Sequence, residues 1–87
     1  MIVGSGSNIK TTSVPLNKYC FVVTLCHYNA GYNSHIEGLD NNTAIGEYGY
    51  NYQENFFYFG KTVSTTITAW NGNGSQYLAY LVVFVFS

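Results

Sequence analysis

A small set of side chains in this chain of 87 residues could act as general acids, general bases or metal ligands. They are the four acids Glu37, Asp40, Glu47 and Glu54 and the two histidines His27 and His35. Two carboxylates at a fixed separation can hydrolyse a glycosidic bond, but any four acids offer some pair. The sequence contains no G-x-S-x-G, H-E-x-x-H or glycine-rich phosphate motif. These patterns predict that the protein is not an enzyme.

Metal binding has one candidate pair, His35 and Glu37. Residues two apart in an extended strand point to the same face, so three copies around an axis could surround an ion. The simpler interpretation places His35 in a loop and makes His27 a buried or half-buried histidine of an apolar strand. We therefore expect no metal and no cofactor.

The two cysteines, Cys20 and Cys26, lie six residues apart in one apolar segment. In a strand they share a face and are separated by roughly 20 Å, which is too far for a disulfide bond. They form no C-x-x-C pair, so they do not predict a zinc site. We expect two buried free thiols, which fits folding in a reducing cytoplasm.

Ligand recognition is indicated by nine tyrosines and one tryptophan, many of them beside asparagine or glycine. Aromatic faces stack on sugars, amides and hydroxyls hydrogen-bond to them, and tyrosine offers a large contact area at low entropic cost. The candidate ligand-binding residues are Tyr28, Tyr32 and Asn33 in one loop and Tyr48, Tyr50 and Tyr52 in another segment. The competing interpretation places aromatic residues in the core or a subunit interface, and we adopt it for the phenylalanines.

The composition limits the possible partners. Apolar residues make up 47% of the chain, whereas charged residues make up 8%, against roughly 25% in an ordinary domain. Three lysines, no arginine and a net charge of −1 argue against binding to nucleic acid. No run of about 20 apolar residues exists, so we expect no membrane insertion. A small domain with so few charges is best kept soluble as a homo-oligomer.

The C-terminal stretch 77–86, YLAYLVVFVF, has apolar residues at both odd and even positions. Such a pattern, rich in Val, Phe and Tyr, predicts a strand that is covered on both faces. One cover is the domain's own second sheet, and the other is a neighbouring subunit. Residues 18–28, KYCFVVTLCHY, have the same character and are the expected partner of this strand.

Residues 1–8 are expected to be a flexible lead-in, and residues 9–87 a single all-β domain. Further strands are predicted at 9–14, 34–39, 43–52, 56–59 and 61–70, with turns at 29–33, 40–42 and 53–55. Asn71-Gly72 predicts a hairpin that joins strand 62–70 to strand 76–86. The fold class is therefore a small antiparallel sandwich or flattened barrel of six to seven strands.

The segments KTTSVPLNKYCFVV and KTVSTTITAWNGNGSQYLAYLVVFVFS together resemble the C-terminal domains of bacteriophage tail fibres. Those domains often begin with a strand that ends at a proline. They continue through Asn/Gly loops and a Thr/Ser-alternating strand, and they close on an aromatic-apolar strand. The resemblance implies a homotrimer at a fibre tip that binds a bacterial surface glycan or protein. It also implies folding in the bacterial cytoplasm and location in the virion, or alternatively at a cell surface.

Three functions follow from the sequence. The first is a receptor-binding or tip domain of a phage fibre or similar adhesin that binds multivalently. The second is a small monomeric or dimeric carbohydrate-binding module. The third is a purely structural trimerisation or capping module with no ligand.

Overall fold

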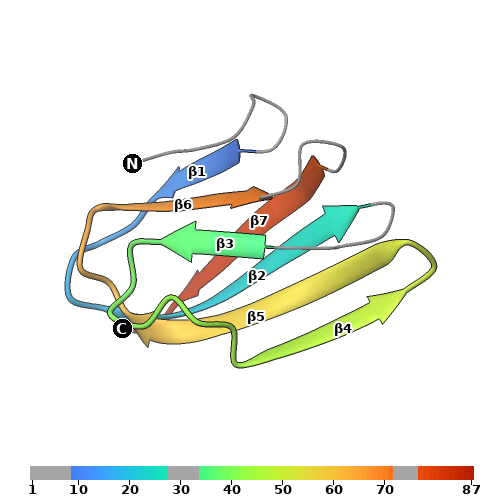
Figure 1. Ribbon diagram of the computed structural model, residues 1–87. Coiled ribbons are helices and arrows are strands. Elements are labelled where there is room, and N and C mark those ends of the chain that lie inside the picture. The colour runs from blue at the N-terminus through green and yellow to red at the C-terminus, as the bar shows by residue number, and fades with distance from the viewer. Residues whose placement is uncertain (1–8, 28–33, 72–76) are drawn as a thin grey trace.

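The computed structural model describes residues 9–27, 34–71 and 77–87, and the side chains of His27, Tyr77 and Ala79 are not described. These residues form seven strands and, within the described ranges, no helix (Figure 1). The strands are β1 (Ile9–Ser13), β2 (Tyr19–His27), β3 (Ser34–Glu37), β4 (Gly46–Tyr50), β5 (Gln53–Lys61), β6 (Thr66–Asn71) and β7 (Tyr77–Val85).

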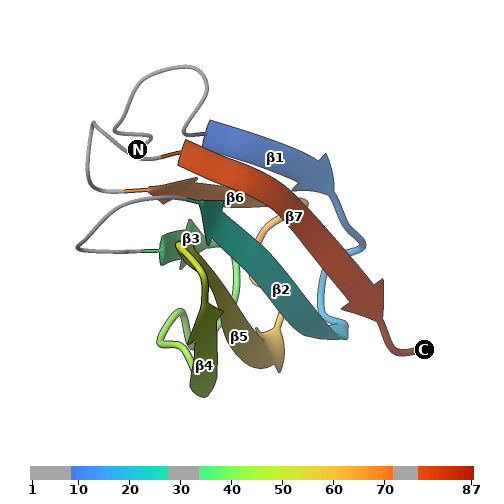
Figure 2. The ribbon, with the colours of Figure 1, turned by 90° about the vertical axis from the view of Figure 1, so that its right-hand side faces the viewer.

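The strands form two antiparallel sheets that pack face to face (Figures 1 and 2). The three-stranded sheet has the order β1-β6-β3, and the four-stranded sheet has the order β4-β5-β2-β7. The predicted all-β sandwich of six to seven strands is confirmed. The predicted partnership of the two most apolar strands is also confirmed, because β2 and β7 are hydrogen-bonded neighbours.

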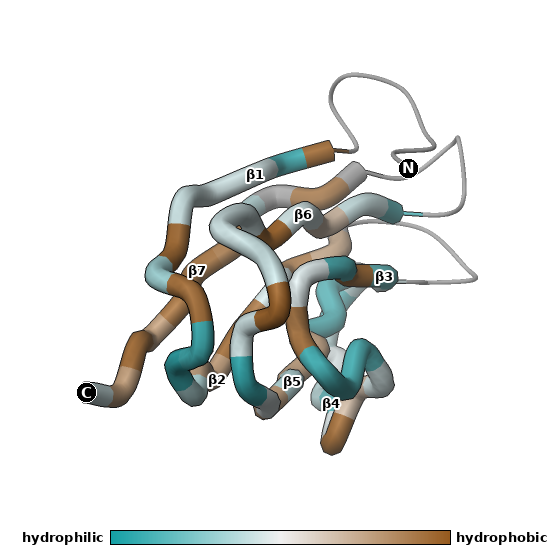
Figure 3. Tube along the Cα trace, turned by 90° about the vertical axis from the view of Figure 1, so that its left-hand side faces the viewer, coloured by the Kyte–Doolittle hydropathy of each residue, from teal (hydrophilic) through white to brown (hydrophobic). Residues whose placement is uncertain are grey.

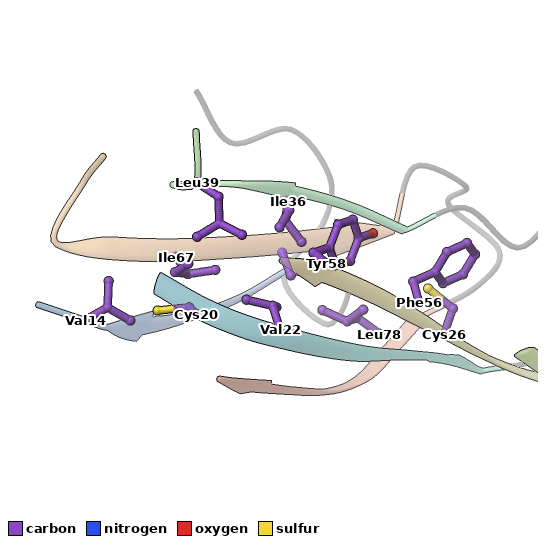
Figure 4. Packing of buried hydrophobic residues seen from close by; sticks show 11 residues of the cluster. Val14, Cys20, Val22, Cys26, Ile36, Leu39, Phe56, Tyr58, Ile67 and Leu78 are labelled. Carbon is purple, nitrogen blue, oxygen red and sulfur yellow. The ribbon is translucent and has the colours of Figure 1, made fainter. Parts of the chain in front are cut away.

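The core lies between the two sheets and follows the period of two along each strand. Every second residue of β2 points inward, so that Cys20, Val22 and Cys26 are fully buried. The three-stranded sheet contributes Ile67 and Ile36 from the opposite side (Figure 4). The remaining members of the core are Val14, Leu39, Phe56, Tyr58, Ala69 and Leu78. Burial of each large apolar side chain contributes about 1.5–3 kcal/mol.

One polar contact joins the two layers inside this core. The Tyr58 hydroxyl of β5 donates a hydrogen bond to Ser34 Oγ of β3 at 2.7 Å, and Ser34 Oγ lies 2.8 Å from Thr24 Oγ1 of β2. Burial raises the pKa of Tyr58, so its hydroxyl stays protonated and available as a donor. Buried hydroxyls without partners are costly, so this contact favours one alignment of the two sheets.

The predicted hairpin between residues 62–70 and 76–86 is wrong. Strand β6 pairs with β1 and β3, whereas β7 pairs with β2 in the other sheet. The chain therefore changes sheets between β6 and β7. The composition of the strands explains this change. Strand β6 has one apolar face and one hydroxyl-rich face, which suits a sheet open to solvent, whereas β7 is apolar on both faces.

The strand predicted at 61–70 is also interrupted. Lys61 ends β5, and β6 begins only at Thr66. Between them Thr62 is buried, where its hydroxyl donates to the Pro15 carbonyl at 2.7 Å and accepts the Lys18 amide proton at 2.9 Å. These hydrogen bonds hold the chain out of the regular strand pattern, and Val63 is left exposed instead of pointing into the core.

The turn predicted at residues 53–55 lies two residues earlier. Asn51 and Tyr52 have φ values of 51° and 64°, and Gln53 already belongs to β5. Two successive left-handed residues are typical of the tight turn that matches the twist of a β-hairpin. The strand expected at 56–59 is therefore extended at both ends, and Glu54 and Asn55 are strand residues.

We predict that Ser34→Ala lowers the free energy of unfolding by about 1–3 kcal/mol, because it removes the hydroxyl that contacts both Tyr58 and Thr24 between the sheets. Urea unfolding at a fixed protein concentration measures this change. Ser13→Ala, at an exposed position of β1, is the matched control and should change stability by less than about 0.5 kcal/mol. Equal effects of the two variants would contradict a stabilising role of the contact between the sheets.

Candidate functional site

The outer faces of the two sheets have opposite characters. The outward positions of the three-stranded sheet carry hydroxyls, which belong to Thr11, Ser13, Thr66 and Thr68. The outward positions of the four-stranded sheet are almost entirely aromatic or aliphatic. The hydropathy colouring shows β7 as mostly hydrophobic along its length (Figure 3). The larger apolar and aromatic surface therefore belongs to the four-stranded sheet, while the three-stranded sheet carries the stacked pair His35 and Trp70 on its outer face.

The strand register arranges this aromatic face in rows. In antiparallel pairs, residues directly opposite each other share a face. One row contains Tyr48, Asn55, Leu25 and Tyr80, from β4, β5, β2 and β7 in that order. The next contains Gly46, Phe57, Val23 and Val82, and the one after it Phe59, Phe21 and Phe84. The face is thus tyrosine-rich at the β4–β5 turn and phenylalanine-rich at the other end.

The tyrosine-rich end, which we call the tyrosine site, consists of Tyr48, Tyr50, Asn55 and Tyr80. Asn55 Nδ2 donates to the Tyr80 hydroxyl at 3.0 Å and also approaches the Thr24 carbonyl at 3.3 Å. Tyr48 lies directly opposite Asn55, and Tyr50 lies one row further toward the turn. Exposed rings beside an oriented amide offer both the stacking and the hydrogen bonds that a sugar ring requires.

The structure brings two of the predicted ligand-binding residues together and separates a third. Tyr48 and Tyr50 share the outer face and are 66% and 68% exposed. Tyr52 is equally exposed but sits in the turn with a left-handed backbone. Tyr28, Tyr32 and Asn33 lie outside the described residues.

Sequence reasoning missed Asn55 and Tyr80. Asn55 was assigned to a turn, and Tyr80 was treated as one of the alternating residues of a strand buried on both sides. The signal available in the sequence was the position of the turn between β4 and β5, which decides which residues of the two strands lie opposite each other. Placing the turn at Asn51-Tyr52 puts Asn55 opposite Tyr48, and the pairing of β2 with both neighbours then adds Tyr80.

The phenylalanine-rich end carries two neighbouring groups of three rings in contact, which together we call the phenylalanine cluster. Tyr19 stacks on Phe59 with ring centroids 5.6 Å apart, and Phe59 contacts Phe86 at 6.1 Å. Phe21 lies between Phe57 at 6.0 Å and Phe84 at 6.3 Å. The one cationic group nearby is at the margin, where Lys61 Nζ lies 5.4 Å from the Tyr19 ring centre within the described surface.

The histidine–glutamate pair lies on the opposite sheet. His35 belongs to β3 and not to a loop, and its ring stacks on Trp70 of β6 at 5.5 Å. Glu37 lies on the same face, opposite Thr68. Among the described residues, no three of His, Cys, Asp and Glu come close enough to hold a metal ion.

The two cysteines are buried free thiols, as the sequence predicts. Burial raises the pKa of Cys20, whose thiol lies 3.8 Å from the Lys18 carbonyl. A thiol with a raised pKa is mostly protonated and is a weak nucleophile. Cys20 is therefore a packing residue of the core.

Among the acids, Glu47 and Glu54 interact directly across the β4–β5 hairpin. The pKa of Glu54 is raised, first by its partial burial and then by the charge of Glu47 and a hydrogen bond between the two side chains. Glu54 therefore keeps its proton to a higher pH than an ordinary glutamate. The described surface contains no pocket in which this pair could enclose a substrate.

Comparisons of the chain with protein-family models, with curated proteins and with solved structures found no match. The described part of the chain also has no helix with the length and apolarity needed to cross a membrane. The interpretation of the site therefore depends on the geometry of these side chains.

We predict that Glu54→Gln removes a pH-dependent loss of stability. Because the pKa of Glu54 is raised in the folded state, its protonated form stabilises the fold at low pH. This contribution is lost as the pH rises through the folded-state pKa. At neutral pH the variant should be more stable than the wild type by about 0.2–1 kcal/mol, and near pH 4 the difference should vanish.

Urea unfolding at the two pH values measures this effect. Ser13→Ala, which removes no ionisable group, is the control, and its difference from the wild type should be the same at both pH values. A constant difference between Glu54→Gln and the wild type would contradict the interaction of Glu54 with Glu47.

Proposed function

We propose that this chain is a non-enzymatic receptor-binding or tip domain of a phage tail fibre or a similar adhesin. In this proposal the chain forms a homotrimer and binds a cell-surface glycan or protein through the tyrosine site. The observation that carries the proposal is the exposed group of Tyr48 and Tyr50 beside Asn55, whose amide is oriented by Tyr80. The sequence resemblance to tail-fibre domains supports the same function and a location in the virion.

The geometry of the tyrosine site favours a shallow mode of recognition. The rings lie on the face of an edge hairpin, so they can stack on a sugar or on a protruding side chain of a receptor. A single contact of this kind is weak. Three such sites on one rigid trimer would raise the overall affinity by about 10²–10⁴ without any further contact.

Two other functions use the same observations differently. A small carbohydrate-binding module would use the tyrosine site as a monomer or dimer. A purely structural trimerisation or capping module would use only the phenylalanine cluster, and the ring contacts of Phe21 and Phe59 favour it as the second candidate. Binding to a ligand separates this last function from the other two.

We predict that Tyr50→Ala reduces adsorption of the protein to its target bacteria at least tenfold, because the variant removes a stacking surface. Tyr50→Phe keeps the ring and should retain most of the binding. The measurement is retention on a panel of intact bacteria and on an array of bacterial surface oligosaccharides. Leu16→Ala, at an exposed turn position on another part of the surface, is the control and should bind like the wild type.

Circular dichroism must first show that each variant is folded. Unaltered adsorption of folded Tyr50→Ala would contradict the assignment of the tyrosine site. Absence of binding by the wild type to every cell and glycan tested would contradict the receptor-binding function and favour the structural module.

A further inference from the structure

We infer that copies of this chain assemble through the phenylalanine cluster together with Val23 and Val82 beside it, so that another copy covers this end of the outer face of the four-stranded sheet. The surface consists of Tyr19, Phe21, Val23, Phe57, Phe59, Val82, Phe84 and Phe86. The inference names the interface of the proposed homotrimer. It rests on the proposal that the chain forms an oligomer, but not on the proposal that it binds a receptor.

The exposed area of the cluster matches what a stable interface needs. Five of its side chains, on β2, β5, β7 and the residue after β7, are each 39–53% exposed. With about 200 Å² for an aromatic residue, the cluster leaves roughly 500 Å² of apolar surface open. This is near the upper limit of about 300–600 Å² for the largest apolar patch of a monomer. With a polar rim it would form one side of a standard interface, about 800 Å² and about 65% apolar.

The absence of charge from the cluster selects the kind of partner. None of its members carries a charge, and Lys61 lies at its margin, with Nζ 5.4 Å from the Tyr19 ring centre. A charged partner would lose hydration on this surface and gain no ion pair. A second apolar sheet face has no charge whose hydration would be lost on contact. Another copy of this chain has such a face. An interface between identical copies also needs no complementary charges.

The shape of the surface points to the same partner. The four-stranded sheet already packs its inner face against a sheet of this chain, with core residues of β2 and β5 such as Val22 and Tyr58 between the layers. Sheets pack readily on sheets, because twisted faces align with interdigitating side chains about 10 Å apart. In the proposed homotrimer, three copies would turn these outer faces toward a common three-fold axis, and the hydroxyl-rich outer face of the other sheet would stay in solvent.

The experiment is hydroxyl-radical footprinting of the wild-type protein at high and low concentration. Phe59 and Phe84 should be protected at high concentration at least fivefold relative to low concentration, while exposed Leu16 should react equally in both. Equal reactivity of Phe84 at both concentrations would overturn the inference. Protection of Phe84 alone would also overturn it, because pairing through the β7 edge would leave Phe59, two strands away, accessible.

Two matched variants test the same surface by a second route. Val82→Glu places a charge within this surface, on β7 in the row next to that of Phe84, and Val63→Glu makes the same change at an exposed site away from it. Val82→Glu should weaken self-association at least tenfold in sedimentation velocity, and Val63→Glu should not. Association of Val82→Glu equal to that of the wild type would overturn the inference. If Phe59 is protected in the oligomer but the protein binds no receptor, the result would contradict the proposed receptor-binding function and leave this inference intact.

Discussion

The rest of the structure depends on one constraint, namely that β2 is apolar on both faces. Its inner residues, such as Val22, are covered by the three-stranded sheet. Its outer residues, such as Phe21 and Val23, are covered only in part by side chains of β5 and β7. The strand therefore takes an interior place in its sheet, and its neighbours must themselves be apolar. This requirement draws β7 away from β6 and creates a sandwich with one polar and one aromatic outer face.

The aromatic face is divided by residue type along the strands. Around Phe59 and Phe84 it offers only rings and aliphatic groups, which suit a contact that excludes water. Around Asn55 it offers hydroxyls and an amide, which can be satisfied by a polar ligand. Assembly and recognition can thus use one sheet without competing. In an oligomer built on the phenylalanine cluster, the tyrosine site lies toward the margin of the contact, with Tyr48 and Tyr50 on the edge strand β4.

The sequence was sufficient for the fold class, because alternation and turn residues locate strands by local rules. The pairing of β2 with β7 and the burial of Cys20 and Cys26 followed from the same patterns. The connection after Asn71 could not be predicted locally, because Asn-Gly fits a hairpin equally well when the chain changes sheets. Only two of the four residues of the tyrosine site were predicted. Tyr48 and Tyr50 are visible as a stripe, but Asn55 and Tyr80 join them only through the register of four strands.

The central claim is that the phenylalanine-rich end of the aromatic face is an interior surface of an assembly. Its most direct test is the molar mass of the wild-type protein in solution, measured by light scattering on a sizing column over a hundredfold dilution. The account predicts a multiple of 9.7 kDa at the concentrated end of this range, with three as the multiple for a fibre tip, and a fall toward 9.7 kDa on dilution. A mass of 9.7 kDa at every concentration would contradict it, because the phenylalanine cluster would then remain exposed to water.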